Sequence, residues 1–289
     1  MAQEPEFAPE IEEKIVSTGV ATLQYREWRE SETQPLAGGM LIVHGFAEHS
    51  MRYARWARRL NEAGYRVAGF DFRGMGSSDG VRGYVLDFKE YVEDLRVAVS
   101  QMKSKLPPGA PLYLYAHSMG GLVALLALSS NDCDCEGAVI SGPLLGVSMT
   151  VPGWKKSLSR ILIRVAPALQ VPLDLEQSSL THDLEDLARL KSDPLSLKQV
   201  TSAWYFASLL AIEQAASHIS KIDTPTLWLV AGEEKIVSKT MIHSTFIQMK
   251  PAGKHTLKEY PGLYHELHNE REPDRSEILK DVLGWLHRL

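Results

Sequence analysis

Cysteine is scarce in this chain, since only Cys133 and Cys135 occur among 289 residues. So few thiols exclude a disulfide-stapled scaffold and favour a reducing, cytoplasmic compartment. Both stand in the stretch Asn-Asp-Cys-Asp-Cys-Glu. A lone C-x-C pair is too short to form a zinc site by itself, so we interpret the two residues as ordinary loop thiols and predict no metal site, with a metal or redox role as the alternative.

Long apolar runs and an excess of basic charge are missing as well. The longest hydrophobic stretches, such as 122–128, fall well short of the roughly 18 residues that span a bilayer. The first residues, Met-Ala-Gln-Glu-Pro-Glu-Phe, are acidic and lack the pattern of a secretory signal. Lysine and arginine number 31 against 36 acidic residues, giving a formal net charge of −5. This balance argues against nucleic acid as a partner.

The chain does contain short apolar runs that alternate with amphipathic stretches, in a composition that is 44% hydrophobic and typical of a globular protein. Such alternation predicts βαβ units and an α/β fold with a largely parallel sheet flanked by helices. We expect strands at 14–17, 21–28, 40–44, 65–71, 112–116, 137–141, 226–231 and 256–260, and helices at 52–63, 88–106, 120–129 and 275–288.

Residues 143–222 interrupt this rhythm, because they carry helical patterns and almost no strand candidates. We predict that they form a helical cap, or lid, inserted between two core segments, 1–142 and 223–289. The alternative is that these helices simply pack on the sheet. A predicted helix at 154–166 has an apolar and a basic face. The basic face could make transient contact with an anionic membrane surface, with an ordinary solvated face as the alternative.

One segment places a short strand, a sharp turn and a helix around a serine: Ala116-His-Ser118-Met-Gly120. It matches the pattern G-x-S-x-G except that Ala116 replaces the first glycine. Small residues are needed on both sides of the serine because the strand and helix backbones come close at this turn. The turn exposes the hydroxyl beside a helix N-terminus, where backbone N–H groups stabilise an anion. Ser118 is therefore the predicted nucleophile, with a mere turn serine as the alternative.

A nucleophilic serine needs a base, which in enzymes with such a turn follows later in the chain. His265 lies in a loop between the expected strand 256–260 and the last helix. A loop at that edge of the sheet is where a base must sit to reach the serine. His268 is three residues further on and is the nearest competitor.

The base in turn needs an acid, expected after the strand 226–231. The loop there reads Gly-Glu233-Glu234-Lys and contains no aspartate. A glutamate can do the same work, because its carboxylate accepts the Nδ1–H of the imidazole and fixes the tautomer. We favour Glu234, with Glu233 and a mere surface pair as the alternatives.

Hydrogen-bond donors for an oxyanion are expected after the strand 40–43, which runs into His44-Gly45-Phe46. A glycine just past a strand lets the backbone turn so that the next N–H points into the site. We assign the oxyanion hole to the N–H groups of Phe46 and of Met119, the residue after the nucleophile. The alternative is that His44-Gly45 is only a tight turn.

Several motifs, taken in order, resemble the α/β-hydrolase superfamily, and within it the monoacylglycerol lipase and lysophospholipase-like serine hydrolases. They are His44-Gly-Phe-Ala-Glu-His-Ser50 with Arg52-Tyr53, Phe70-Asp-Phe-Arg-Gly-Met-Gly-Ser-Ser78, Ala116-His-Ser-Met-Gly-Gly121, Ser192-Asp-Pro-Leu195 and Tyr264-His-Glu-Leu-His268. The resemblance implies an α/β-hydrolase fold with a mostly parallel eight-stranded sheet, a helical cap, and hydrolysis of a carboxylic ester of a single-chain acylglycerol or lysolipid. It implies no metal or organic cofactor.

The resemblance also implies roles for individual residues. The group's acid loop reads Ala-Gly-x-Asp-x-x-Val, and its aspartate falls on Glu234 without a gap. A cap tyrosine of some members corresponds to Leu190, a departure that bears on glycerol as the head group. Polar residues that match head-group positions are Glu48, Arg52, His117 and His268. Cap residues that would line an acyl tunnel, unless they are only core, include Leu144, Leu145 and Ile161.

The sequence thus predicts a serine carboxylic ester hydrolase that acts on single-chain lipid esters through an acyl-enzyme on Ser118. Two alternatives stay open. One keeps the catalytic machinery and changes the substrate to a thioester, a peptide N-terminus or an acceptor alcohol. The other, from a different class, is a catalytically silent binding protein on this fold. The expected partner is a small lipid ester, and the sequence leaves the oligomeric state open.

Overall fold

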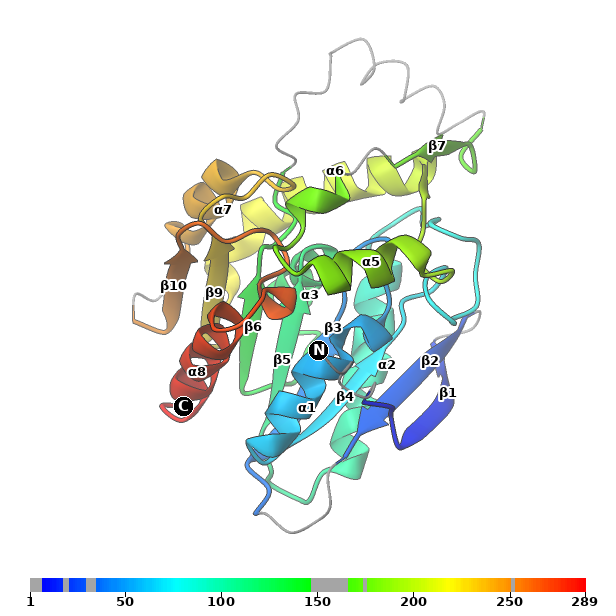
Figure 1. The fold of residues 1–289 in the computed structure, drawn as a ribbon. Helices are drawn as coiled ribbons and strands as arrows, with labels where there is room; N and C mark the ends of the chain where they lie inside the picture. The colour runs from blue at the N-terminus through cyan, green and yellow to red at the C-terminus, as the bar shows by residue number, and fades with distance from the viewer. Residues whose placement is uncertain (1–6, 18–20, 30–34, 147–165, 174–175, 251–252) are drawn as a thin grey trace.

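The expected alternation folds into one eight-stranded sheet (Figure 1). The computed structural model describes residues 7–17, 21–29, 35–146, 166–173, 176–250 and 253–289. The strands of the sheet are β1 (Ile11–Ser17), β2 (Ala21–Trp28), β3 (Gly38–Val43), β4 (Tyr65–Phe70), β5 (Leu112–His117), β6 (Gly137–Ser141), β9 (Thr226–Ala231) and β10 (His255–Tyr260).

The sheet is mostly parallel, as expected. Its order is β1-β2-β4-β3-β5-β6-β9-β10, and only β1–β2 and β2–β4 are antiparallel pairs among its described strands. The parallel strands therefore end at one common edge, where the loops that follow β3, β5, β6 and β9 meet. The α/β fold class read from the sequence is confirmed.

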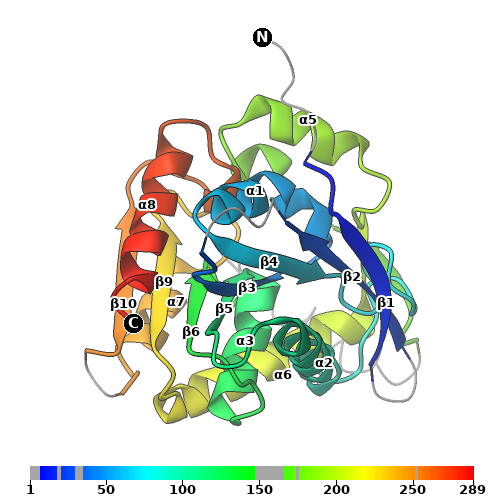
Figure 2. The same ribbon diagram turned by 90° about the horizontal axis from the view of Figure 1, so that it is seen from below.

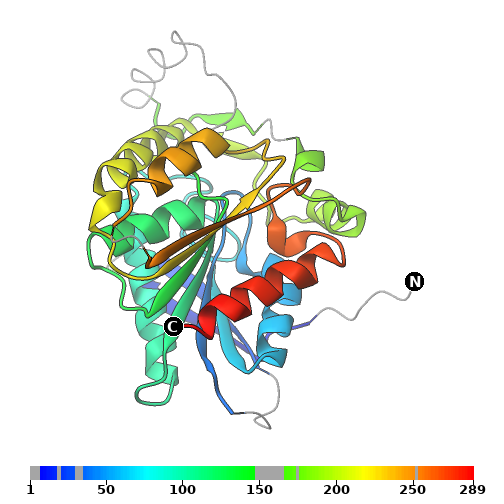
Figure 3. The same ribbon diagram turned by 90° about the vertical axis from the view of Figure 1, so that its left-hand side faces the viewer.

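Helices cover both faces of the sheet (Figure 2). In this view α1 and α8 lie on one side and α2 and α3 on the other, and Figure 3 shows the twisted strands between these layers. The described helices are α1 (Ala54–Glu62), α2 (Lys89–Lys105), α3 (Met119–Ser129), α5 (Leu184–Ser192), α6 (Ser202–His218), α7 (Lys239–Phe246) and α8 (Asp274–Leu286), with short 3₁₀ turns η1 (Ser50–Tyr53), η2 (Gln177–Ser179), η3 (Ile219–Lys221) and η4 (Leu267–Asn269).

Two apolar clusters, one on each face, hold these layers together. Along β3, Leu41 and Val43 belong to the cluster that includes α2 and α3, whereas Met40 and Ile42 belong to the cluster that includes α1 and α8. All four side chains are fully buried. Strands buried on both faces read as continuous apolar runs, which is why the sequence identified them without an alternating pattern.

The chain between β6 and β9 differs in detail from the expectation. It contains a short antiparallel pair, β7 (Gln170–Pro172) with β8 (Gln199–Thr201), where almost no strand was expected. Each of these strands has only three residues, which is too short for sequence periodicity to reveal. Helix α6 packs against α3, and α5 lies above α1 (Figure 1). The helix expected at 154–166 and its residue Ile161 lie outside the described residues.

Two further elements correct the sequence interpretation. Helix α7 was not expected; it begins after Ser238, whose hydroxyl accepts a hydrogen bond from the Met241 N–H and so caps the helix. The helix expected from residue 52 begins at Ala54, because the 3₁₀ turn η1 occupies the preceding residues. In the described part of the chain, no helix combines the length and the apolar character needed to cross a membrane.

Candidate active site

Ser118 occupies the sharp turn between β5 and α3. Its backbone is strained, with φ of 51° and ψ of −113°. Two residues later, a Cβ on Gly120 would lie only 2.2 Å from the carbonyl oxygen of Val43. The end of β3 therefore passes so close to the start of α3 that only glycine fits there. The turn that the sequence predicts around the serine is present, with the half-buried Ser118 at its tip.

His265 and Glu234 meet at the same edge of the sheet. The Nδ1 atom of His265 lies 2.7 Å from Oε2 of Glu234, and both side chains are buried. The other carboxylate oxygen, Oε1, accepts hydrogen bonds from the N–H groups of Ile236 (2.8 Å) and Val237 (3.2 Å). Glu233, the competing acid, is exposed. Contacts with two backbone N–H groups and with the imidazole thus hold the carboxylate of Glu234 in place beside His265.

The charges of this pair stabilise each other. Burial alone would raise the pKa of Glu234, but the neighbouring His265 and the two backbone N–H donors outweigh it and hold that pKa below its usual value. Burial alone would lower the pKa of His265, but Glu234 outweighs it and raises that pKa above 6.5. An imidazolium on His265 is therefore stabilised by the carboxylate behind it.

A short segment after β6 touches both the serine turn and the histidine. The N–H of Ser118 donates to the carbonyl of Ser141 (2.9 Å), and the N–H of Leu144 donates to the carbonyl of Ser118 (3.0 Å). Between them, a Cβ on Gly142 would lie 3.1 Å from Cε1 of His265. The structure therefore gathers the nucleophile, base and acid expected from the sequence around one loop. Leu144 and its neighbour Leu145 are buried in the core cluster that includes α3.

The loop after β3 lies against the serine from the other side. A Cβ on Gly45 would sit 3.3 Å from Cβ of Ser118. The N–H of Gly45 donates to Oε1 of Glu48 (2.5 Å), which also accepts the hydroxyl of Tyr53 (2.7 Å). The ring of Phe46 stacks at 3.7 Å on Trp204 of α6. Glu48 thus orders the backbone that leads to Phe46, the residue expected to supply an oxyanion donor.

The guanidinium of Arg52 forms ion pairs with three carboxylates. Its Nη1 lies 3.0 Å from Oε2 of Glu48, it forms a two-pronged bridge with Glu266 (2.8 and 2.7 Å), and its Nη2 lies 2.8 Å from Asp186 of α5. Burial raises the pKa of Asp186 to about 6, despite the adjacent Arg52. The sequence interpretation missed Glu266 and Asp186. Nothing in the sequence indicates this role, because the two carboxylates meet the guanidinium of Arg52 only in the folded chain.

His117 and His268 pack beside the catalytic histidine candidate. The His117 ring lies 4.7 Å from that of His265 and 4.9 Å from that of His268, and His268 stacks on Tyr53 at 4.3 Å. Burial, together with the neighbouring His117, lowers the pKa of His268 to about 3. Within the described residues, neither ring nitrogen of His268 has a hydrogen-bond partner. His268 is therefore neutral and lacks the carboxylate that supports His265.

The Ser-Asp-Pro-Leu motif joins the inserted segment to the loop after β3. Oδ2 of Asp193 lies 2.7 Å from Nε2 of His49, and the N–H of Leu197 donates to the carbonyl of Ala47 (2.9 Å). The motif therefore fixes the position of the inserted segment next to the expected oxyanion donor.

A second junction involves Glu270, which the sequence interpretation also missed. This fully buried carboxylate accepts the N–H of Tyr264 (2.9 Å) and the N–H of His182 (3.1 Å), and it lies 3.0 Å from Nδ1 of the His182 ring. The ring of His182 stacks on Tyr264 at 3.8 Å. The residue before His265 is thus fastened to the inserted segment. No group of three metal-ligating side chains occurs in the parts of the chain that the structure covers.

The profile of the family described as serine aminopeptidase, S33, matches residues 34–272. Phospholipase YtpA of Bacillus subtilis is 29% identical over 88% of this chain and 96% of its own length. An abhydrolase domain-containing protein of Dictyostelium discoideum is 27% identical over 94% of this chain, which spans only 28% of that longer protein. The crystal structure of Paleococcus ferrophilus monoacylglycerol lipase superposes with a TM-score of 0.80 at 26% identity, covering 91% of this chain and 98% of that one.

Proposed function

The chain belongs to the serine aminopeptidase, S33, family of α/β-hydrolases, and we propose that it hydrolyses carboxylic esters of single-chain lipids, of the monoacylglycerol or lysophospholipid type. The observation that carries the proposal is the buried Glu234–His265 pair at the sheet edge where Ser118 stands on its strained turn. An acid, a base and an activated serine are the parts that acyl transfer requires.

In the proposed reaction, Oγ of Ser118 attacks the ester carbonyl while Nε2 of His265 takes its proton. The carboxylate of Glu234 stabilises the imidazolium, consistent with the raised pKa of His265. The N–H groups of Phe46 and Met119 donate to the oxyanion. His265 then protonates the leaving alcohol, and a water molecule activated by the same ring releases the fatty acid from Ser118.

The substrate class rests on relatives and on the polar and apolar surroundings of the serine. The names of two similar proteins, a phospholipase and a monoacylglycerol lipase, support a lipid ester as the substrate. We propose that the head group of the substrate lies on the side of Glu48, Arg52, His117 and His268. Of these residues, Glu48 and Arg52 act mainly by ordering the loop after β3. We propose that the acyl chain lies on the side of Leu144 and Leu145; Ile161, predicted to share this role, lies outside the described residues. We also propose that residues 143–222 act as the cap and make transient contact with the membrane that supplies the substrate.

The nucleophile is tested with a fluorophosphonate probe. The wild-type protein should label, Ser118→Ala should not, and the matched variant Ser130→Ala, which removes an exposed hydroxyl at the end of α3, should label like the wild type. A folded wild-type protein that does not react would overturn the proposal and favour a silent binding protein.

The substrate class is tested by comparing kcat/KM across monoacylglycerols and lysophospholipids of increasing chain length. Acyl thioesters and aminoacyl p-nitroanilides serve as competing classes. Single-chain lipid esters should give the highest values. A preference for thioesters or p-nitroanilides would retain the serine mechanism and reject the lipid ester assignment.

A further inference from the structure

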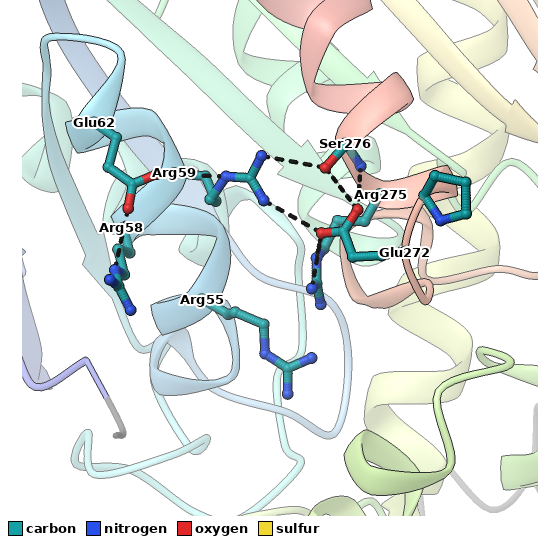
Figure 4. Close-up of a pocket in the computed structure, with 8 residues that line it drawn as sticks. Arg55, Arg58, Arg59, Glu62, Glu272, Arg275 and Ser276 are labelled. Carbon is teal, nitrogen blue, oxygen red and sulfur yellow. Dashed lines mark hydrogen bonds and ion pairs between the residues drawn. The ribbon is translucent and has the colours of Figure 1, made fainter. Parts of the chain in front are cut away.

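A pocket of about 510 Å³ lies between α1 and the start of α8 (Figure 4). None of the proposed catalytic residues lines it. The lining side chains come from the two helices and the turn before α8, and they are Arg55, Arg58, Arg59, Glu62, Glu272, Pro273, Arg275 and Ser276. Figure 4 shows Arg59 of α1 reaching toward Glu272 and Ser276 at the start of α8, whereas Arg58 lies beside Glu62.

The charge of this pocket opposes that of the whole chain. Four guanidinium groups and two carboxylates line it, so its formal charge is +2, whereas the chain carries −5. Arg55 also pairs with Asp183 of the inserted segment, outside the lining, at 2.8 Å. Even with this carboxylate included, the pocket keeps a positive charge. A cavity with such a local excess attracts anions.

The guanidinium groups also have more donors than the pocket has acceptors. Arg59 donates to Glu272 and to the hydroxyl of Ser276, both at 3.2 Å. Arg275 donates through Nε (3.1 Å) and Nη2 (3.0 Å) to the same oxygen of Glu272. Its Nη1 has no partner in the described part of the chain, although the side chain is only 10% exposed. The carboxylates around Arg275 therefore do not satisfy all of its donors.

From these observations we propose that the pocket between α1 and α8 binds a phosphate group through Arg55, Arg59 and Arg275. Guanidinium groups from two helices approach from different directions, which suits a tetrahedral anion with several oxygens better than a planar carboxylate. Glu272 holds Arg59 and Arg275 in place between binding events. The phosphate group is either that of a small phosphomonoester or the head group of an acidic lipid, since both present the same oxygens.

The site is tested by titrating the full-length protein with inorganic phosphate in a calorimeter, with ionic strength held constant by sodium chloride. Arg59→Gln should bind phosphate about tenfold more weakly, because one charge-assisted contact is lost. Glu272→Gln should bind more tightly, because a competing carboxylate is removed. The control Arg96→Gln removes an arginine of α2, outside the pocket, and should bind like the wild type.

The three variants make the proposal falsifiable even if one of them unfolds. Circular dichroism and hydrolysis of a soluble p-nitrophenyl ester should show that Arg59→Gln is folded and active. The proposal is wrong if the wild type shows no saturable phosphate binding, or if Arg59→Gln and Arg96→Gln bind alike. A merely structural ion-pair network predicts that Glu272→Gln loses stability without gaining phosphate affinity, and that result would also reject the site.

The source of the phosphate group is decided with vesicles of phosphatidylcholine, with and without phosphatidic acid. Retention that requires phosphatidic acid and is lost in Arg59→Gln supports the site as a lipid head-group site. Phosphate binding without retention on vesicles supports it as a site for a small phosphomonoester. Because this pocket is separate from Ser118, its failure would leave the proposed ester hydrolysis untouched.

Discussion

At the scale of single residues, two adjacent glutamates have opposite surroundings. Glu234 is buried against His265, whereas Glu233 is exposed. We expect Glu234→Gln to lower kcat about 10⁴-fold, because the amide favours the wrong imidazole tautomer and no longer stabilises the imidazolium. Glu233→Gln is the matched control and should stay close to the wild type. Steady-state kinetics on a p-nitrophenyl ester distinguishes them, and a crippled Glu233→Gln enzyme would contradict the assignment.

The same carboxylate sets the pH dependence of the reaction. A base must be neutral to take the serine proton, so kcat/KM should fall as the pH drops through the pKa of His265. Burial lowers that pKa, but Glu234 outweighs burial and raises it, so the acid limb of the profile should lie at higher pH than the usual pKa of a histidine. In Glu234→Gln the residual activity should show its acid limb at lower pH. A limb that does not move would mean that Glu234 does not act on this histidine.

At the scale of elements, the loop that carries His265 is held by the inserted segment. Glu270, fully buried, joins the Tyr264 N–H to His182. We expect Glu270→Gln to lower kcat about 10- to 100-fold with little change in KM, because a small displacement of a catalytic group is costly. The control Glu185→Gln changes an exposed carboxylate of the inserted segment and should keep full activity.

Kinetics should separate this positioning role from a general loss of stability. The melting temperature should be measured, and the rate of fluorophosphonate labelling should be compared at a temperature well below the melting transition. If Glu270→Gln melts earlier but labels and turns over like the wild type, the residue stabilises the fold only, and the positioning role is wrong.

At the scale of the whole molecule, the inserted segment is joined to the core at both sides of the serine. The N–H of Leu197 donates to Ala47 beside the expected oxyanion donor, and the N–H of Glu266 donates to Leu180 (2.7 Å) beside His265. The ion pair of Asp186 with Arg52 lies between these two junctions. The described part of this segment is thus packed as a piece of the active site rather than as a separate unit.

This arrangement predicts a pattern of hydrogen exchange. The amides of Leu197 and Glu266 should be protected and should exchange together, because each crosses a junction between segment and core. The exposed amide of Glu185 in α5 has its own partner in the helix N-cap and provides an internal comparison. Exchange of Leu197 and Glu266 at the rate of unprotected amides, with β5 still protected, would show that the two parts open independently.

The sequence by itself determined the sheet, the serine turn and the family. Buried strands need continuous apolar runs, and the turn around Ser118 needs a glycine two residues later, so both leave local signatures. The motifs in order identified the α/β-hydrolase resemblance, which the family match confirms. Helix α7 and the short β7–β8 pair were not predicted, because each has too few residues to show a clear periodic pattern.

Only the tertiary structure decided which charged side chains share an environment. Arg52 meets carboxylates that lie up to 214 positions away in the chain, and Glu270 meets His182 across 88 positions. The same holds for the arginines between α1 and α8, which face one another only after both helices have packed on the sheet. The physical reason is that burial and pairing depend on distance in space, whereas sequence patterns record only neighbours along the chain.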